Sequence, residues 1–467
     1  MMTVYNILLC WALTMGLPLL FPIILLSPKR RKTVLHRLGL TPIPGRSRVT
    51  EPGKCRRVWI HALSVGEVIS AVPLVKAWTE HFPRTEIVFS ASTQTGIETA
   101  HRLIREHVCA VFHFPYDLIF SVKHIVSRID PDLAVIVETD IWPNFLMEMR
   151  RRQIPVFLVN TRLSAKSFAA YRKFSFFTKP LFQCFEKICP QSRADAQRFR
   201  QVGVSPDRIV LTGNMKFDQP VTAPDERSLR QMRENLGIDP GRKILIAGST
   251  HEGEEHIVSI VYAALKHHVP ELALIIAPRN PDRAGIVCRI FRERGYGARK
   301  MAEVEENPSP VWDVMAVDRI GVLKNLYGLS DIAFVGGSLV PLGGHNPLEP
   351  AALARPVLFG PHMSDFAEIS QMLMEAEAAV QVRDQESFCK AALDFLRNEN
   401  RAREAGKQGH RVFCENRGAV ERTVAAIRNS VSLGKDGRKI KLPEETERMQ
   451  ILQEKEISLS LGTREKT

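Results

Sequence analysis

The stretch VWIHALSVGEVISAVPLVKAWTEHFPRTEIVFS (58–90) decides the fold class. It begins and ends with short apolar runs rich in β-branched residues, VWIHAL (58–63) and EIVFS (86–90), and the longer segment between them has helical spacing. Continuous apolar strands joined by a helix are typical of a parallel sheet that helices cover on both faces. The stretch therefore predicts an α/β unit.

The same alternation continues along the chain and then starts again. The first series goes on with LAVIVE (133–138), PVFLVN (155–160) and RIVLTG (208–213), and the second series is KILIAGS (243–249), LALIIAP (272–278), DVMAVD (313–318), IAFVGG (332–337) and PVLFG (356–360). We therefore expect two facing Rossmann-like domains. The expected divisions are a membrane anchor with a basic flank (1–32), an N-terminal domain (33–217), a linker rich in proline and charge (218–242), a C-terminal domain (243–430) and a charged tail (431–467).

Length and composition agree with two globular domains. The chain has 467 residues, 45% of them hydrophobic and 25% charged, which excludes a largely disordered or fibrous protein. Its net charge of +13 favours anionic partners such as nucleic acid, phosphorylated lipid or an acidic membrane surface. The 8 cysteines form no C-x-x-C pair, which argues against a zinc ribbon or a disulfide framework and indicates a reducing compartment.

The N-terminus predicts a membrane anchor. Residues 4–26 carry no charge over about 23 positions, which is long enough to span the hydrocarbon core as a helix. The basic cluster 29–32 follows directly, so the positive-inside rule leaves the main body in the cytoplasm, at the inner membrane. A cleaved signal peptide would need basic residues before the apolar run, whereas a buried core helix remains an alternative. Pro18 and Pro22 leave open a monotopic insertion instead of a single full span.

Polar residues follow four of the predicted strands, where ligands of doubly wound sheets bind. Glu67, Glu138 and Lys216 come after the first, third and last runs of the first series, and the glycine-rich segment 336–352 follows a run of the second. Backbone N–H groups near Asn346 and Pro347 would suit a phosphate, and Glu349 could accept hydrogen bonds from ribose hydroxyls.

Each of these features also has a structural interpretation. Glu67 could complement a helix dipole, Glu138 could form an ion pair, Lys216 could be a solvated loop residue, and the glycines could serve turns only. The segment HEGEEH (251–256) lacks the H-E-x-x-H spacing of a zinc site, so we expect no metal.

Taken together, WIHALSVGE, ETDIWPN, NTRLS, GNMKFD, AGSTHEGEE, APRNPDR and GGSLVPLGGHNPLEPAA occur in the order of one family. The sequence resembles the 3-deoxy-D-manno-octulosonic acid (Kdo) transferases of Gram-negative bacteria, from the N-terminus to about residue 425. The resemblance implies a GT-B glycosyltransferase that moves Kdo from CMP-Kdo to lipid A precursor (lipid IVA) in lipopolysaccharide synthesis. It further implies inversion at the anomeric carbon and neither metal nor other cofactor.

The resemblance also implies roles for individual residues. Glu67 matches the family's base, and Glu138 and Lys216 match positions that stabilise the transition state. The CMP-binding positions correspond to Pro278, Arg279, Arg319, Ile320, Gly321, Asn346, Pro347, Leu348 and Glu349, and Ser249 and Thr250 are weaker phosphate candidates. The chain departs from the family pattern at Asp140 and Val322, where Glu is common; the second departure puts side-chain contacts of that loop in doubt.

Two other functions remain as alternatives. A different GT-B enzyme that uses a UDP-sugar would share the fold and the anchor, and the nucleotide it releases would identify it. A membrane-tethered nucleic-acid-binding or scaffolding protein would explain the basic surplus, but it would need a basic and aromatic stripe. Aromatic residues are only 7% of the chain, so we expect no nucleic-acid partner; anionic membrane lipids and lipid phosphates account better for the charge.

Overall fold

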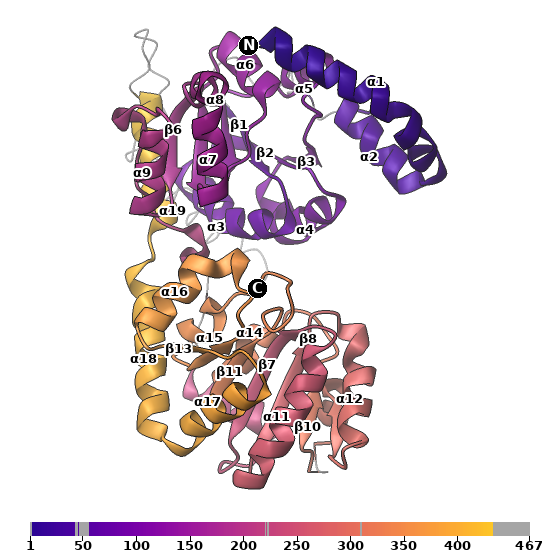
Figure 1. The fold of residues 1–467 in the computed structure, drawn as a ribbon, viewed down its shortest axis with the longest axis vertical. Helices are drawn as coiled ribbons and strands as arrows, with labels where there is room; N and C mark the ends of the chain where they lie inside the picture. Colours follow the sequence, from indigo (N-terminus) through magenta and orange to yellow (C-terminus); the bar gives the residue numbers. More distant parts are fainter. Residues whose placement is uncertain are drawn as a thin grey trace, which may run out of the picture. The chain divides into compact units, whose positions relative to one another are not determined.

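The computed structural model describes residues 2–42, 45, 56–219, 221, 224–308 and 311–432. The chain divides into two compact units (Figure 1). The first unit is Met1–Gln219 together with Arg417–Thr467, and the second is Pro220–Asn416. Each unit is built on a parallel sheet of its own, as the alternation of strands and helices predicts.

The sheet of the first unit has six strands in the order β3-β2-β1-β4-β5-β6. The chain adds β2 and β3 on one side of β1 and then returns to place β4 on the other side. The order therefore reverses between β1 and β4, where His61 and Ile136 are register partners. A ligand is expected at the carboxyl ends of the strands at this reversal. The strands are β1 (Arg56–Ala62), β2 (Thr85–Ala91), β3 (Ala110–His113), β4 (Leu133–Val137), β5 (Val156–Thr161) and β6 (Phe185–Pro190).

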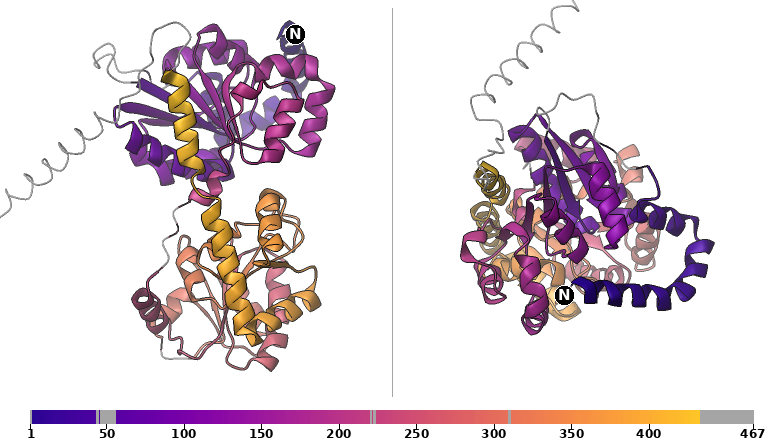
Figure 2. Two further views of the ribbon diagram at one scale, coloured as in Figure 1. Left: turned by 90° about the vertical axis from the view of Figure 1, so that its left-hand side faces the viewer. Right: turned by 90° about the horizontal axis from the view of Figure 1, so that it is seen from above.

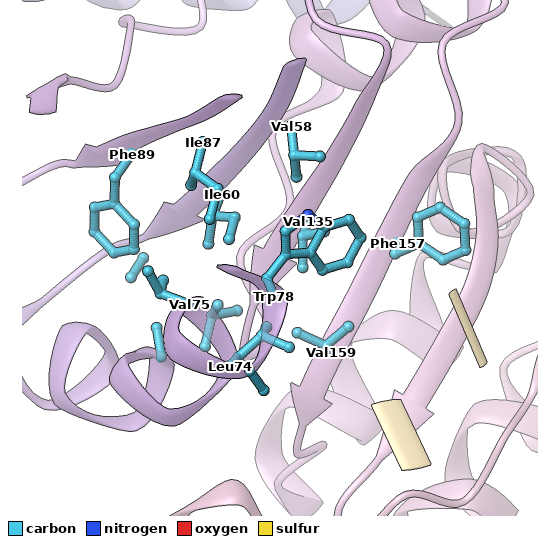
Figure 3. Packing of buried hydrophobic residues seen from close by; sticks show 14 of the residues in the cluster. Val58, Ile60, Leu74, Val75, Trp78, Ile87, Phe89, Val135, Phe157 and Val159 are labelled. Carbon is cyan, nitrogen blue, oxygen red and sulfur yellow. The ribbon is translucent and has the colours of Figure 1, made fainter. Parts of the chain in front are cut away.

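Two apolar layers cover this sheet, because successive side chains of a strand point to opposite faces. Val58 and Ile60 of β1 pack with Trp78 of α3 on one face (Figure 3). Trp59 packs on the other face with Phe145 of α6. Burying each such side chain contributes about 1.5–3 kcal/mol. The α-helices are α3 (Val65–His81), α4 (Gln94–Ile104), α5 (Ile119–Ile129), α6 (Pro143–Arg151), α7 (Ala165–Lys173), α8 (Ser175–Phe182) and α9 (Arg193–Gln201); short 3-10 turns are η1 (Arg105–His107), η2 (Pro206–Arg208) and η3 (Met215–Asp218).

The last helix, α19 (Ala419–Ser432), belongs to the first unit although it follows the whole second unit in sequence (Figure 2). Val420, Val424 and Ile427 are buried in the same apolar cluster as α3. The sequence analysis placed residues up to 430 in the C-terminal domain. The structure instead returns the chain to the first unit after Asn416, because the apolar face of α19 completes that core. The expected tail beyond residue 432 lies outside the described residues.

The sheet of the second unit has seven parallel strands in the order β13-β12-β11-β7-β8-β10-β9. Its order reverses between β7 and β11, where Gly248 and Val335 are register partners. The strands are β7 (Ile244–Thr250), β8 (Ala273–Pro278), β9 (Ala298–Lys300), β10 (Val314–Ala316), β11 (Ile332–Val335), β12 (Val357–Phe359) and β13 (Ala379–Gln381). The helices are α10 (Glu226–Asn235), α11 (Glu254–His268), α12 (Ala284–Arg292), α13 (Met301–Glu306), α14 (Leu323–Leu326), α15 (Leu348–Ala352), α16 (Ala367–Glu375), α17 (Gln385–Arg397) and α18 (Glu399–Glu415), with η4 (Pro281–Arg283), η5 (Tyr327–Leu329) and η6 (Ser364–Phe366).

Two further predicted segments differ from the structure. The run 208–213 is not a strand, because Ile209 forms only an isolated bridge with Ile188. The last strand of the first sheet is β6, which was not predicted because it contains charged residues. The predicted linker 218–242 contains α10, and Leu236 and Ile238 after this helix are buried in the core of the second unit. The linker is therefore largely part of the second unit.

The hydrophobic N-terminus forms α1 (Met2–Leu26), and the basic cluster lies in α2 (Pro28–Leu38). The start of α1 is attached to the first unit, because Tyr5 Oη donates to Asp117 Oδ2 at 2.9 Å and Asn6 exchanges amide hydrogen bonds with Asn144 at 2.7 and 3.1 Å. No helix within the described part of the chain is long and apolar enough to cross a membrane. The anchor over residues 4–26 stays a prediction.

Candidate active site

Glu67 and Glu138 come together at the reversal of the first sheet. Glu67 lies in the first turn of α3, directly after β1, and Glu138 is the first residue after β4, the neighbouring strand. Burial and the negative charges of Glu138 and Asp140 together raise the pKa of Glu67 to about 8. The strand ends thus hold two carboxyl groups within electrostatic reach of each other.

The surroundings of Glu67 bear on both interpretations of this residue. The backbone N–H of Leu63 donates to Glu67 Oε2, and contacts with the N–H groups of Leu63 and Ser64 favour the ionised carboxylate, as in a helix cap. These contacts are outweighed, because the net pKa is still about 8. A carboxyl group that only caps a helix would have a lowered pKa. Glu67 is therefore suited to exchange a proton near neutral pH.

A set of hydrogen-bonded and stacked side chains lies beside this carboxyl pair. Asp140 Oδ2 accepts hydrogen bonds from His61 Nε2 at 3.0 Å and from Trp142 Nε1 at 2.8 Å. The His61 ring stacks on Phe114 with ring centroids 3.9 Å apart, and its Nδ1 lies 3.0 Å from Ser90 Oγ. The sequence analysis gave no role to His61, Asp140 or Trp142, although two lie in the ETDIWPN motif. The pattern that pointed to Glu138, a polar residue near the end of a predicted strand, could also have pointed to these residues.

Lys216 lies on η3, a turn that hydrogen bonds hold from both ends. On one side, the N–H groups of Lys216 and Met215 donate to the side chains of Asn214 and Asn160, each at 2.9 Å. On the other side, both oxygens of Asp218 accept N–H groups at the start of α19, from Gly418 and Val420 at 2.6 Å. The buried Met215 joins the apolar cluster of α3, so the turn packs against the helix that carries Glu67.

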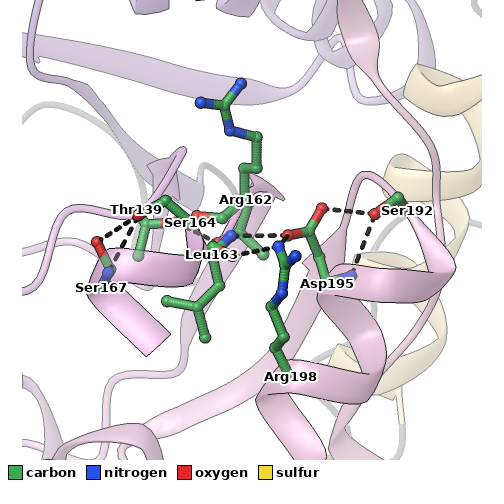
Figure 4. Close-up of polar contacts among 9 residues, drawn as sticks. Thr139, Arg162, Leu163, Ser164, Ser167, Ser192, Asp195 and Arg198 are labelled. Atoms are coloured by element: carbon green, nitrogen blue, oxygen red, sulfur yellow. Dashed lines mark hydrogen bonds and ion pairs between the residues drawn. The ribbon is translucent and has the colours of Figure 1, made fainter. Parts of the chain in front are cut away.

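The loop after β5 adds a further cation to the same edge of the sheet (Figure 4). Thr139 Oγ1 donates to the carbonyl of Arg162, and the following N–H of Leu163 donates to Asp195 Oδ1 at 2.8 Å. The backbone of Arg162 is therefore fixed, whereas its guanidinium is exposed and makes no hydrogen bond or ion pair with any described residue. Arg162 was not among the predicted site residues; it lies in the NTRLS motif.

In the second unit, the predicted donor residues gather around β7. Ser249 and Thr250 end this strand, Pro278 ends β8, and the N–H of Arg279 donates to the Thr250 carbonyl at 2.8 Å. Ser249 has a φ of 56°, and Gly336 approaches so closely that an added Cβ would lie 2.5 Å from the Ser249 carbonyl oxygen. Strand β7 and the loop after β11 are thus locked together at the reversal of the sheet.

Several N–H groups of the glycine-rich loop are already hydrogen-bonded. The carboxylate of Glu254, which is fully buried, accepts from His251 and Gly337 at 2.9 and 2.7 Å and from Ser338 and Leu339 at 3.0 and 2.9 Å. The N–H of Leu348 is bonded to Asn346 Oδ1 at 3.1 Å. The N–H groups of residues 337–339 and of Leu348 are therefore occupied within the protein. The phosphate site that the sequence suggests near Asn346 and Pro347 stays a prediction.

Arg279 and Glu349 do come together. Burial raises the pKa of Glu349, and the cations Lys324 and Arg279 lower it. The neighbouring Pro347 and Leu348 are buried and form the base of α15. The structure does not bring Arg319 into this group, because its guanidinium pairs with Glu305 on α13. The adjoining Ile320 is 69% exposed, and Gly321 has a φ of 96°.

His251 and His345 form a pair beside this cluster. Their rings are stacked almost parallel, at 4°, and their Nε2 atoms lie 2.8 Å apart. No group of three or more His, Cys, Asp or Glu side chains that could hold a metal ion occurs in the described ranges of the chain.

The chain is similar in sequence to proteins of known family. Residues 32–219 match the family model of 3-deoxy-D-manno-octulosonic-acid transferase. The 3-deoxy-D-manno-octulosonic acid transferase of Haemophilus influenzae is 34% identical over 405 residues, which cover 86% of this chain and 92% of the relative. The chain belongs to the Kdo transferase family. It is therefore a glycosyltransferase, and the resemblance seen in its motifs is confirmed.

Other relatives of the family agree. The transferase of Chlamydia muridarum is 30% identical over 409 residues, covering 86% of this chain and 93% of that protein. Among solved structures, UDP-GlcNAc 2-epimerase from Neisseria meningitidis bound to UDP-GlcNAc is similar in fold, with a TM-score of 0.54 and 12% identity over 79% of this chain and 98% of that one. This likeness concerns the fold of two Rossmann-like domains, which this Kdo transferase family member shares.

Proposed function

We propose that this protein transfers Kdo from CMP-Kdo to a lipid A precursor, with inversion at the anomeric carbon and without a metal ion. The observation that carries the proposal is the carboxyl pair of Glu67 and Glu138 at the reversal of the first sheet, with a Glu67 pKa of about 8. An inverting transfer needs one base to take the proton of the acceptor hydroxyl, and a carboxylate that titrates near neutral pH serves this role.

In the proposed reaction, the Glu67 carboxylate accepts the proton of the attacking hydroxyl. The hydroxyl oxygen forms a bond to the anomeric carbon of Kdo, and the bond to the phosphate of CMP breaks, so that CMP leaves with the electron pair. Glu138 stabilises positive charge that develops on the sugar ring, and Lys216 balances the Kdo carboxylate or the departing phosphate. The turn that carries Lys216 is fixed at both ends, which suits a group that must not reorganise during the reaction.

The second unit would hold CMP-Kdo. Arg279 is the proposed partner of the phosphate, because a guanidinium binds phosphate oxygens in bidentate fashion. Glu349 is the proposed acceptor of ribose hydroxyls, and its cation neighbours Lys324 and Arg279 keep anionic groups of the donor nearby. Ser249, Thr250, Pro278, Asn346, Pro347 and Leu348 would shape the nucleotide pocket, and Ile320 and Gly321 would contribute through the loop after β10. Arg319 would join them only by leaving its ion pair with Glu305.

The lipid acceptor requires a membrane surface. We propose that α1 associates with the cytoplasmic face of the inner membrane and that the basic residues of α2 contact its anionic lipids. The exposed apolar side chains of α1, including Ile7, Leu8 and Trp11, support this assignment. Each Lys or Arg close to such a surface contributes about 1 kcal/mol.

One assay tests the whole proposal. The protein is incubated with CMP-Kdo and tetraacylated lipid A precursor in detergent, with and without a chelator, and the products are read by mass spectrometry. We expect the acceptor to gain whole Kdo units with release of CMP, unchanged by the chelator, and the new linkage to have inverted configuration by NMR. Transfer from a UDP-sugar instead, or loss of activity on chelation, would contradict the donor or the metal-free mechanism respectively.

A further inference from the structure

His251 and His345 share one proton between their Nε2 atoms. Because these atoms lie 2.8 Å apart, one must carry a hydrogen and the other must accept it. The rings lie within 4° of parallel, and the ring of His345 is held against Gly337, where an added Cβ would lie 3.0 Å from the His345 Cδ2 atom. The backbone N–H of His251 donates to Glu254 Oε2 at 2.9 Å. Protein contacts thus hold the His345 ring and the backbone of His251.

The other ring nitrogens face outward. Neither Nδ1 atom makes a hydrogen bond within the described residues, and neither is among the buried polar atoms that lack a partner, so both reach solvent. When both rings are neutral, the ring that donates from Nε2 has a bare Nδ1, and only its partner presents an Nδ1–H. When the pair takes up one proton at the bare Nδ1, the Nε2 hydrogen bond stays intact and both Nδ1 atoms become donors.

We propose that His251 and His345 bind the phosphodiester of the nucleotide-sugar donor as a pair that takes up one proton when the donor binds. This inference rests on the proposed function of the second unit. The neutral pair presents one lone pair and one N–H donor to an anion, whereas the protonated pair presents two N–H donors and a positive charge. The N–H groups of residues 337–339 already donate to Glu254 and so cannot donate to a phosphate. The histidine pair would supply hydrogen-bond donors in their place.

The surrounding charges set the direction of the effect. Burial and the positive charge of Arg279 lower the pKa of both rings, that of His345 to about 4. Glu254 and Glu255 on α11 raise the pKa of His251, and Arg283 lowers it. A bound phosphate offsets the charge of Arg279 and raises both pKa values. Donor binding is therefore coupled to proton uptake, and affinity rises as pH falls from neutral toward the pKa of the free pair.

Isothermal titration calorimetry tests the coupling, with two probes that isolate the phosphate. Cytidine carries no anion, and the methyl phosphodiester of CMP carries one that does not titrate near neutral pH. Titrations at about pH 5.5 and about pH 7.5, in buffers with different heats of ionisation, count the protons taken up. We expect uptake of up to one proton with the phosphodiester, an affinity gain of at most about tenfold per pH unit, and neither effect with cytidine.

Variants assign the effect to the pair. Glutamine keeps an amide donor but cannot take up a proton, so the double variant His251→Gln/His345→Gln should lose both the uptake and the pH dependence while still binding cytidine. His256→Gln, which changes an exposed histidine five residues from His251, is the matched control and should behave as wild type. Unchanged uptake in the double variant, or uptake only with a complete donor that also carries the sugar carboxylate, would overturn the inference. Failure of the wild-type protein to bind any cytidine nucleotide would instead overturn the proposed function.

Discussion

Glu67 should set the acid limb of the pH–rate profile. A carboxyl group with a pKa of about 8 is ionised in only about one molecule in ten at pH 7, so turnover should rise with pH through this value and then level off. Replacement of Glu67 by Gln removes the base while keeping the volume of the side chain. We expect a loss of about 10²- to 10⁴-fold in kcat, which corresponds to about 2.7–5.4 kcal/mol of activation free energy.

Glu138→Gln tests the effect of the Glu138 charge on the pKa of Glu67 separately from the proposed role of Glu138 in stabilising the transition state. The negative charge of Glu138 raises the pKa of Glu67, so its removal should move the acid limb to lower pH even if the plateau rate falls. Initial rates of CMP release from pH 5.5 to 9 with saturating CMP-Kdo give both quantities. Glu80→Gln, an exposed carboxylate in the last turns of the same helix, is the control and should leave the profile unchanged. A wild-type acid limb near the ordinary carboxyl range, or near-wild-type turnover in Glu67→Gln, would refute the assignment.

Four further substitutions test the surroundings of the site. Glu138→Gly should relieve the left-handed backbone at a φ of 63° and raise the unfolding free energy by up to about 1 kcal/mol while lowering turnover; a loss of stability would contradict the strain. Arg162→Ala should raise KM for the phosphorylated lipid more than for CMP-Kdo, whereas equal KM values would argue against an anion contact. Asp218→Ala frees the two N–H groups of α19 and should lower kcat through Lys216 with little change in CMP affinity by calorimetry. Glu254→Gln turns an amide toward two of its four N–H donors and should cost about 2–6 kcal/mol in urea unfolding; a loss below about 1 kcal/mol would mean that the loop rearranges.

Long apolar runs were the part of the fold that the sequence could predict. Strands β1, β4, β5, β7 and β8 are continuous apolar stretches between helical segments, so their type and order follow from the pattern. Strands β3, β9 and β13 have only three or four residues and were not predicted, whereas the equally short β10 and β12 lie within longer apolar runs. Strand β6 contains charged Glu186 and Lys187. The location of α19 could not be predicted either. Its amphipathic pattern shows that one face is buried but does not say in which unit.

Some residues of the candidate site could likewise be predicted from the sequence, and others could not. Glu67 and Glu138 could be found from sequence because each follows a strand, and neighbouring strands of a doubly wound sheet place such residues together. The role of Glu254 as acceptor for the glycine-rich loop could not be predicted from the sequence. Four backbone N–H groups meet its carboxylate only after two distant segments have folded. The contact between His251 and His345 also depends on the fold, since 94 positions separate the two rings.

Three of the seven non-glycine residues with a positive φ in the described ranges lie at the places of the proposed chemistry. Glu138, Asn160 and Ser249 have φ values of 63°, 52° and 56°, and each lies at or just after the carboxyl end of a strand. A left-handed conformation costs a residue other than glycine about 1–2 kcal/mol. Glycine would avoid this cost but would remove the carboxylate beside Glu67 and the amide that holds the turn of Lys216. The retained side chains therefore indicate positions where a polar group in a fixed place matters more than local stability, which is the expected condition of a preorganised active site.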